Sequence, residues 1–402
     1  MLLSQGINQR LINVQATKYT KMRLMLSLIV FFYSVSLFGQ PEKARYFSLH
    51  EGLSSQRVLD VAHDKNGFVW IATELGLNRF ASNSFKQYYK SENADALSVN
   101  SNEINTLYYD NDQLYIGTRA NGLNVLDMKT NRFSYYLHDP NDRQSIATND
   151  ITDIIKGKSG KLWLATYHQG VQRFDPIKKQ FEHFNRDNTP SLPENSIWTL
   201  AEDEHGLLYI GHVSKGISIF NTNDRNVELL DVQSTKGMLP DNEVKALFCD
   251  SKNNIWIGTR RGLAVYNPLK RTMQRISLAS KAKNAVEPFV YAIKEIEGDI
   301  WIGTESSQLF ILKPDYSTDR DIKQIRTIIP FNLNRGNNSS VQNIDLDNFG
   351  NVWLGIYGGG IAFLGHLKPF FSVFPTPEKM PGLDKLATVT GILHDNKLRG
   401  IF

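Results

Sequence analysis

One short phrase recurs seven times along this chain, and it constrains the fold more than any other feature. An aromatic residue is followed by an aliphatic residue, a small residue and usually Thr, and in every copy except that at Trp301 a Gly stands two to five residues later. The copies lie 45 to 52 residues apart and begin at Trp70, Tyr115, Trp163, Tyr209, Trp256, Trp301 and Trp353. A period of this length is typical of an array of small sheets. Each unit is too small to bury its own apolar face and must pack on its neighbours.

One repeat predicts four short strands. The residues after Trp70 alternate in character and pass through Gly76 into a second strand, which indicates a hairpin. An earlier apolar run, Val58–Asp64, reaches Trp70 through a turn at Asn66-Gly67. Two further strand-like segments follow Gly76. Four strands in each of seven periods, with no long helical pattern, predict an all-β, seven-bladed β-propeller of four-stranded antiparallel blades.

A small residue stands two positions after each aromatic residue of the repeat. These residues are Ala72, Gly117, Ala165, Gly211, Gly258, Gly303 and Gly355. We expect each to lie where neighbouring blades approach closely, because a larger side chain would hold them apart. The aromatic residues are expected to fill the space between blades, so we assign them to stability rather than to a ligand site.

The two ends of the repeat array predict how the ring closes. Tyr46–Leu49 looks like an outer strand without a blade, and the last repeat ends after Ile361–Leu364. Pairing these segments would remove the exposed edges and close a propeller over residues 41–368. Pro369–Phe374 and Val389–Asp395 then repeat the opening of the array. We interpret residues 369–402 as the start of a second, truncated propeller.

Residues 1–40 are predicted to hold a signal peptide with a short helix. Lys21 and Arg23 precede an apolar stretch, Leu24–Phe38, and Met22 is the expected true start. About fifteen apolar residues are fewer than a membrane span needs. A buried helix or an uncleaved anchor is the alternative. Export to the periplasm of a Gram-negative bacterium is expected, and the single cysteine, Cys249, is consistent with it.

Composition argues against several classes of function. The formal charge of +4 is spread over all repeats without a basic face, so nucleic acid is not an expected partner. We find neither His-x-x-x-His nor Cys-x-x-Cys spacing and no phosphate-binding glycine loop, so no metal or cofactor is predicted. Asp60 and Asp153 could form a carboxylate pair only at a suitable separation and pKa, and no catalytic residue is assigned.

Candidate ligand-binding residues stand where the repeat is interrupted by variable side chains, because propellers gather their loops around one channel. Most follow the repeat phrase directly. Trp198 and Tyr291 instead occupy a position of the inner strand where Leu59 and Lys245 stand in other repeats, and they could stack on a sugar or pack between blades. The candidates are Glu74, Arg119, Tyr167, His168, Trp198, Arg260, Arg261, Tyr291, Glu305 and Tyr357. Solvated turn residues would vary in the same way, so both interpretations stay open.

Two further series recur at fixed offsets. Small or polar residues of the inner strands are expected to line the channel around ordered water; they are Asp60, Thr106, Asp153, Thr199, Ala246, Ala292 and Asn343. Amides precede the inner strands and are expected to cap turns in preference to binding a ligand; they are Gln56, Asn102, Asn149, Asn195 and Asn242.

These residues resemble the two-component regulator propeller repeats found in the periplasmic part of hybrid sensor histidine kinases of the Bacteroidetes. Gly52–Ser55, Asp64–Thr73 and Gly76–Phe80 carry the resemblance, which extends over about Arg45 to Asp395. It implies two propellers and a β-sandwich outside the membrane, a kinase and a regulator inside, and detection of oligosaccharides released from glycans. We recognise no kinase region, receiver domain or later membrane span, so a ligand-sensing module that is not itself an enzyme is expected.

Two alternatives remain from the sequence. One is a propeller-fold polysaccharide lyase, with Arg119, Tyr167, His168 and Arg260 neutralising charge and transferring protons. The other is a scaffold that binds proteins through its rim. The expected partners are an oligosaccharide and, with it, another propeller or a second copy of the chain.

Overall fold

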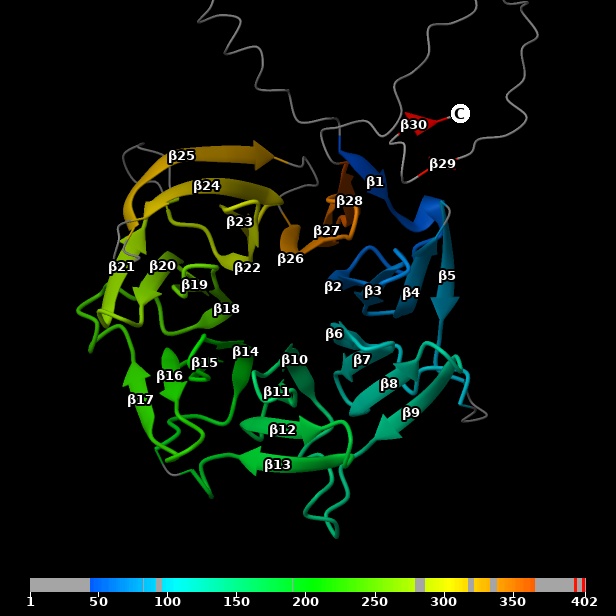
Figure 1. Cartoon of the computed structure of the whole chain (residues 1–402), viewed down its shortest axis with the longest axis horizontal. Helices are drawn as coiled ribbons and strands as arrows, with labels where there is room; N and C mark the ends of the chain where they lie inside the picture. The colour runs from blue at the N-terminus through cyan, green and yellow to red at the C-terminus, as the bar shows by residue number, and fades with distance from the viewer. Residues whose placement is uncertain are drawn as a thin grey trace, which may run out of the picture. The chain divides into compact units, whose positions relative to one another are not determined.

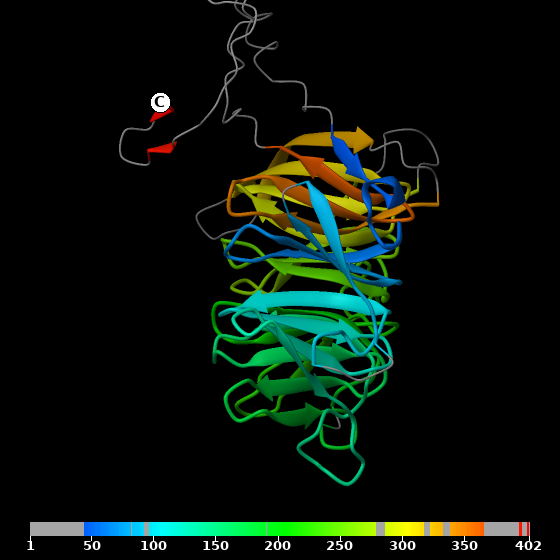
Figure 2. The same ribbon diagram turned by 90° about the vertical axis from the view of Figure 1, so that its right-hand side faces the viewer.

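The computed structural model of the chain describes residues 44–365 except 82, 92–95, 190, 279–285, 317–321 and 333–337, together with 394–395 and 400–401. The expected signal peptide at 1–40, with Met22, lies outside the described residues. Within them, seven four-stranded sheets stand around a central axis as blades, and the first strand of each blade lies innermost (Figure 1). Figure 2 shows the same ring from the side. The predicted all-β seven-bladed propeller is confirmed.

Six blades are antiparallel meanders of consecutive strands. Blade 1 consists of β2 (Val58–His63), β3 (Val69–Thr73), β4 (Gly76–Ala81) and β5 (Ser84–Tyr88). Blade 2 consists of β6 (Ile104–Asp110), β7 (Gln113–Thr118), β8 (Leu123–Asp127) and β9 (Arg132–Tyr136). Blade 3 consists of β10 (Ile151–Lys156), β11 (Leu162–Thr166), β12 (Val171–Asp175) and β13 (Gln180–Phe184).

The remaining blades follow the same order. Blade 4 consists of β14 (Ile197–Glu202), β15 (Leu208–His212), β16 (Ile217–Phe220) and β17 (Val227–Leu230). Blade 5 consists of β18 (Val244–Cys249), β19 (Ile255–Thr259), β20 (Gly262–Asn267) and β21 (Thr272–Ile276). Blade 6 consists of β22 (Val290–Ile296), β23 (Asp299–Thr304), β24 (Gln308–Tyr316) and β25 (Ile322–Asn332). Blade 7 consists of β26 (Ser340–Leu346), β27 (Val352–Tyr357), β28 (Gly360–Leu364) and β1 (Arg45–Phe47).

The seventh blade closes the ring with a strand from the start of the array. β1 pairs antiparallel with β28, with Tyr46 opposite Ala362, as the sequence predicted. Phe47 is 2% exposed, and its ring lies 6.0 Å from that of Trp353 and 4.8 Å from that of Phe80 in blade 1. A short 3₁₀ helix, η1 (Leu49–Glu51), follows. The closing strand therefore joins the last blade to the first through both its backbone and its side chain.

The repeated aromatic residues fill the space between blades. Trp70 of blade 1 is fully buried and packs with Ile104, Leu114 and Ile116 of blade 2. Five of its counterparts are buried in the same way, and Trp301 is half-buried. Burial of this much apolar surface in each gap is the main attraction between neighbouring blades.

The five glycines of the small-residue series lie close against the next blade, as expected, and Ala72 and Ala165 are fully buried. A Cβ atom added to Gly258 would lie 2.6 Å from Val290 at the start of the next inner strand. The corresponding contact of Gly355 is with Val58, at 3.0 Å, across the closure. A side chain at Gly258 would clash, and one at Gly355 would require Val58 to move, so a larger residue at either position would strain the packing between blades.

An aspartate six residues before the aromatic residue has a role that the sequence analysis missed. One oxygen of the Asp64 carboxylate accepts the backbone N–H groups of Asn66 and Phe68 in the turn, and the other accepts the Trp70 indole N–H at 3.0 Å. Blades 5 and 7 repeat this with Asp250–Trp256 and Asp347–Trp353. Each buried carboxylate thus couples the turn of a hairpin to the aromatic residue that fills the gap.

The segment after the propeller forms a separate unit, His366–Phe402. The structure describes only its short antiparallel pair, β29 (His394–Asp395) and β30 (Gly400–Ile401). Most of the predicted second propeller, at 369–402, lies outside the described residues and stays a prediction. Among the described residues, no helix has the length and apolar character needed to span a membrane.

Changing Trp70 to Phe should destabilise the protein by about 1–3 kcal/mol more than changing Trp163 to Phe. Both changes remove the same volume, but only Trp70 donates to a buried aspartate; blade 3 has Gly157 at that position. Urea denaturation of the two variants measures the difference. Equal losses of unfolding free energy would show that the indole–carboxylate hydrogen bond contributes nothing.

Changing Phe47 to Ala should lower the free energy of unfolding by about 3–5 kcal/mol, because the closing strand loses its buried ring. The matched control is Leu269→Ala, since Leu269 is 69% exposed and its change should cost less than about 0.5 kcal/mol. A Phe47 variant as stable as this control would mean that closure does not depend on side-chain packing.

Candidate functional site

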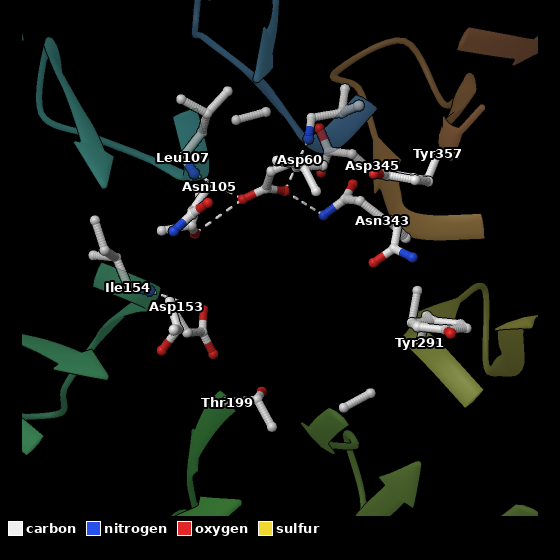
Figure 3. Close-up of a pocket in the computed structure, with 18 of the residues that line it drawn as sticks. Asp60, Asn105, Leu107, Asp153, Ile154, Thr199, Tyr291, Asn343, Asp345 and Tyr357 are labelled. Atoms are coloured by element: carbon white, nitrogen blue, oxygen red, sulfur yellow. Dashed lines mark hydrogen bonds between the residues drawn. The ribbon is translucent and has the colours of Figure 1, made fainter. Parts of the chain in front are cut away.

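The inner strands enclose a central channel of about 1540 Å³. Figure 3 shows side chains from several blades converging on it, among them Asp60, Asp153, Tyr291 and Asn343. All seven members of the small or polar series line the channel, as the sequence predicted. The loops that precede the inner strands and those that follow the repeat phrase contribute to its wall as well.

A β-bulge in every inner strand adds one more residue to the channel wall. In blade 1, Val58 pairs with Thr73 and Asp60 with Ala72, so Leu59 is left without an opposite residue. The same register shift occurs in all seven blades. The bulged residues are Leu59, Asn105, Thr152, Trp198, Lys245, Tyr291 and Gln342, and all line the channel. Bulges change the direction of side chains, so all seven blades present one residue to the channel at the same structural position, and that residue differs from blade to blade.

Three of the bulged residues have polar side chains that form hydrogen bonds within the protein. The side chain of Asn105 donates to the carbonyl of Ile151, and that of Thr152 donates to the carbonyl of Ile197, so each holds the next blade. Gln342 donates to the hydroxyl of Ser340 within its own strand. These three polar groups are therefore occupied by the fold itself.

Three consecutive blades instead present the residues that we call the Trp–Lys–Tyr arc: Trp198, Lys245 and Tyr291. The Lys245 ammonium lies 3.7 Å from the centroid of the Trp198 ring, a cation–π contact. The Trp198 ring also contacts that of Tyr167 at 5.3 Å, and Tyr291 stacks on Phe289 at 4.3 Å. Among the described residues, none accepts a hydrogen bond from a side chain of the arc, and the Trp198 indole N–H is buried without a partner.

Burial governs the ionisation of the arc. It lowers the pKa of Lys245 to about 8, although the charges of Asp153 and Glu243 oppose this shift. Burial, with the charges of Glu305 and Glu243, raises the pKa of Tyr291. At neutral pH, Lys245 is therefore mostly a cation and Tyr291 a neutral hydroxyl, so both are hydrogen-bond donors.

Asp60 ties three blades together on the channel wall. Its carboxylate accepts the backbone N–H groups of Val61 and Leu107, at 2.8 and 2.7 Å, and the hydroxyl of Thr106 at 3.0 Å. The amide of Asn343 in blade 7 donates to it across the closure (Figure 3). Desolvation outweighs these hydrogen bonds and raises the pKa of Asp60 to about 7.

Asp153 repeats this arrangement two blades further on. It accepts the backbone N–H groups of Ile154 at 2.8 Å and of Leu200 in the next blade at 2.9 Å, and burial raises its pKa. Both aspartates therefore satisfy backbone donors of adjacent inner strands. This use differs from that of a carboxylate pair free to exchange protons with a substrate.

Six of the ten candidate ligand-binding residues lie on the channel wall: Glu74, Arg119, Tyr167, Trp198, Tyr291 and Tyr357. Glu74 accepts from Arg57 at 2.9 Å and from the Tyr357 hydroxyl at 2.8 Å, which links blades 1 and 7. Arg119 lies 3.9 Å from Glu103.

The other four candidates do not line the channel. The His168 ring packs against Tyr167 at 4.5 Å. Arg260 pairs with Glu243 at 3.3 Å, and Arg261 pairs with Asp241 at 3.2 Å. Glu305 accepts the backbone N–H of Phe289 at 3.4 Å. The set suggested for a lyase is therefore split, because Arg119 and Tyr167 line the channel whereas His168 and Arg260 do not.

Four of the five amides cap backbone N–H groups, as expected, but each bond reaches back to the segment that follows the preceding blade; the role of Gln56 stays a prediction. The side chain of Asn149 accepts the backbone N–H of His138, and that of Asn195 accepts the N–H of Arg186. Asn102 and Asn242 do the same with Lys90 and Val232.

Lys245, Asn105 and Gln342 are channel residues that the sequence candidates omitted. Lys245 could have been identified from the sequence, because it is the one charged residue at an inner-strand position that is neutral in the other six repeats.

At the other end of the inner strands, His63 contacts Asp345 at 2.7 Å, and Lys294 lies 3.7 Å from the same carboxylate. Its hydrogen bond to Asp345 raises the pKa of His63. In the described ranges, no three His, Cys, Asp or Glu side chains come together as a metal site would require.

Two of the repeats match a known family model. Residues 52–74 and 238–261 match the family model described as two component regulator propeller. Histidine kinase P4 of Formosa agariphila is 26% identical over 212 residues, which are 52% of this chain and 15% of that protein.

Solved structures show the same fold. The extracellular domain of a Bacteroides thetaiotaomicron protein assigned as a hybrid two component system is 35% identical, with a TM-score of 0.68 over 81% of this chain and 42% of that one. A second such domain from the same organism, at 21% identity, has a TM-score of 0.64 over 81% of this chain and 43% of its own. The chain thus spans less than half the length of these relatives.

The raised pKa of Asp60 predicts a pH-dependent difference between the wild-type protein and Asp60→Asn. The ordinary pKa is 3.8 and the folded value is about 7, so the folded state binds this proton more tightly than the unfolded state. The contribution of Asp60 to stability should therefore fall as pH rises from about 4 to 7.

The unfolding free energy of Asp60→Asn, minus that of the wild type, should rise over this window and then level off. Urea denaturation at a series of pH values measures it. The pKa of His63 is also raised, but His63 is present in both proteins and cancels from the difference. Parallel pH profiles would contradict the assignment.

Proposed function

We propose that this chain is the extracytoplasmic ligand-sensing propeller of a hybrid two-component histidine kinase, and that it recognises a carbohydrate; the match of residues 52–74 and 238–261 to the two component regulator propeller model supports this. A periplasmic location is part of this proposal. It is supported by the likeness to extracellular domains of hybrid two component systems. The observation that carries it is the Trp–Lys–Tyr arc on the channel wall.

The channel offers the surfaces that a saccharide needs. Sugar rings present C–H groups on their faces, which suit the aromatic rings of Trp198, Tyr167 and Tyr291. A channel of about 1540 Å³ exceeds the usual 300–1,000 Å³ of a small-molecule pocket, which is room for more than one sugar residue.

The aromatic side chains gather in one part of the ring. Trp198 and Tyr291 stand on blades 4 and 6 with Lys245 between them on blade 5. The bulged residues of the remaining blades are Leu59, Asn105, Thr152 and Gln342, of which the polar three are engaged by the protein. We therefore place the ligand against blades 4 to 6.

The enzymatic alternative has less support. Asp60 and Asp153 are engaged with backbone donors, and His168 and Arg260 lie off the channel wall. Binding without chemistry is the function that this arrangement supports best, with any catalytic step left to other parts of a longer protein.

Calorimetry against a panel of neutral, uronic acid-containing and sulfated oligosaccharides tests this function. At least one member should bind the folded protein, and Tyr291→Ala should weaken that binding about threefold to tenfold, because a stacking surface is lost. Tyr89→Ala is the matched control, since Tyr89 is 45% exposed and does not line the channel. A folded protein that binds no member of the panel would refute carbohydrate recognition.

A further inference from the structure

We propose that the ligand of this propeller carries an anionic group, a carboxylate or a sulfate ester, which binds Lys245 between Trp198 and Tyr291. This inference rests on the proposed function, because it specifies the chemistry of the ligand at the same site. It follows from how the charges of the channel are paired.

Lys245 differs from every other cation that lines the channel in the described residues. Arg57 pairs with Glu74 at 2.9 Å, and Arg119 lies 3.9 Å from Glu103. His63 and Lys294 share the carboxylate of Asp345, at 2.7 and 3.7 Å. Lys245 alone in this set has no carboxylate at ion-pair distance, and the face of Trp198 is its contact.

The nearest acidic groups are already committed. Asp153 accepts two backbone N–H groups, and Glu243 pairs with Arg260 at 3.3 Å. Both act on Lys245 only through their more distant charge. Lys245 is half-buried, and desolvation of its ammonium without a counter-ion is costly. An anion that enters the channel would reduce this cost.

The neighbours of Lys245 favour an acceptor as well. The indole N–H of Trp198 is buried without a partner, and the Tyr291 hydroxyl donates to no described residue. A carboxylate or sulfate only accepts hydrogen bonds, so it complements this group of donors. A neutral sugar hydroxyl could donate only to the Tyr291 oxygen on the arc, because the Lys245 ammonium and the Trp198 indole N–H only donate.

The fold itself does not require a cation at this address. The equivalent bulged residues of other blades are neutral, and two of them hold the next blade through hydrogen bonds. Among the described residues, Lys245 makes no such hydrogen bond to the next blade, so its ammonium is available to bind a ligand.

The experiment compares wild-type protein with Lys245→Met, which keeps the length and apolar volume of the side chain but removes the charge. Calorimetry uses uronic acid oligosaccharides, sulfated oligosaccharides and neutral oligosaccharides of the same length. We expect an anionic member to bind the wild type and to bind Lys245→Met about tenfold to a hundredfold more weakly. Lys245→Arg should recover most of the loss because it restores the charge.

Lys294→Met is the matched control, since it removes a cation from the same channel at the other end of an inner strand. It should bind the anionic ligand as the wild type does. Thermal unfolding checks that each variant is folded, and removal of the unpaired charge is expected to leave Lys245→Met at least as stable as the wild type.

The possible outcomes separate the two proposals. Selective loss of anionic binding in Lys245→Met supports the inference, and the uronic acid and sulfated arms then identify the anionic group. Binding of neutral oligosaccharides alone, or equal binding of an anionic one by wild type and Lys245→Met, overturns the inference but leaves carbohydrate recognition standing. A folded protein that binds nothing in the panel overturns both.

Discussion

The pairing of β1 with β28 is the constraint on which the rest of this structure depends. A propeller blade cannot bury its apolar faces alone, and an unclosed row would leave the first and last blades each with a bare face. The closing strand brings Phe47 against Trp353, and the same closure lets Asn343 reach Asp60 and Tyr357 reach Glu74. The channel exists because these contacts hold the first blade against the seventh.

Repetition supplies the scaffold, and a repeated β-bulge supplies variable positions on the channel wall. Each inner strand carries a bulge, so the fold presents seven equivalent positions on the channel wall without altering the ladder beyond them. Blades 2 and 3 use the position to hold their neighbours through Asn105 and Thr152. Blades 4 to 6 use it for Trp198, Lys245 and Tyr291, whose polar atoms have no hydrogen-bond acceptor among the described residues. The bulged positions of blades 4 to 6 can therefore vary while the hydrogen bonds that Asn105 and Thr152 make to neighbouring blades are kept.

The charged residues that line the channel in the described ranges also fall into two groups, those with a charged or hydrogen-bonding partner within the fold and one without. Asp60 and Asp153 are the residues whose position and ionisation first suggest chemistry, yet their oxygens accept backbone N–H groups that the bulged strands leave exposed. Lys245 is less conspicuous in the sequence. Among the cations that line the channel in the described residues, it is the one without a carboxylate at ion-pair distance. Function is better indicated here by an unsatisfied partner than by a shifted pKa, because structural networks also shift pKa values.

The sequence by itself determined the number of blades, their four-stranded form and the closure, because the period and the apolar alternation are local and repeat seven times, with turn glycines in most copies. It also predicted the close approach at Gly258 and the lining series that includes Asp60 and Asn343. Tertiary structure decided which variable residues meet. Arg260 and Arg261 follow the repeat phrase just as Glu74 does, but they pair with Glu243 and Asp241 away from the channel. Lys245 reaches the channel because a bulge turns it there, and a register shift between strands is a property of their pairing that a single strand's residues do not encode.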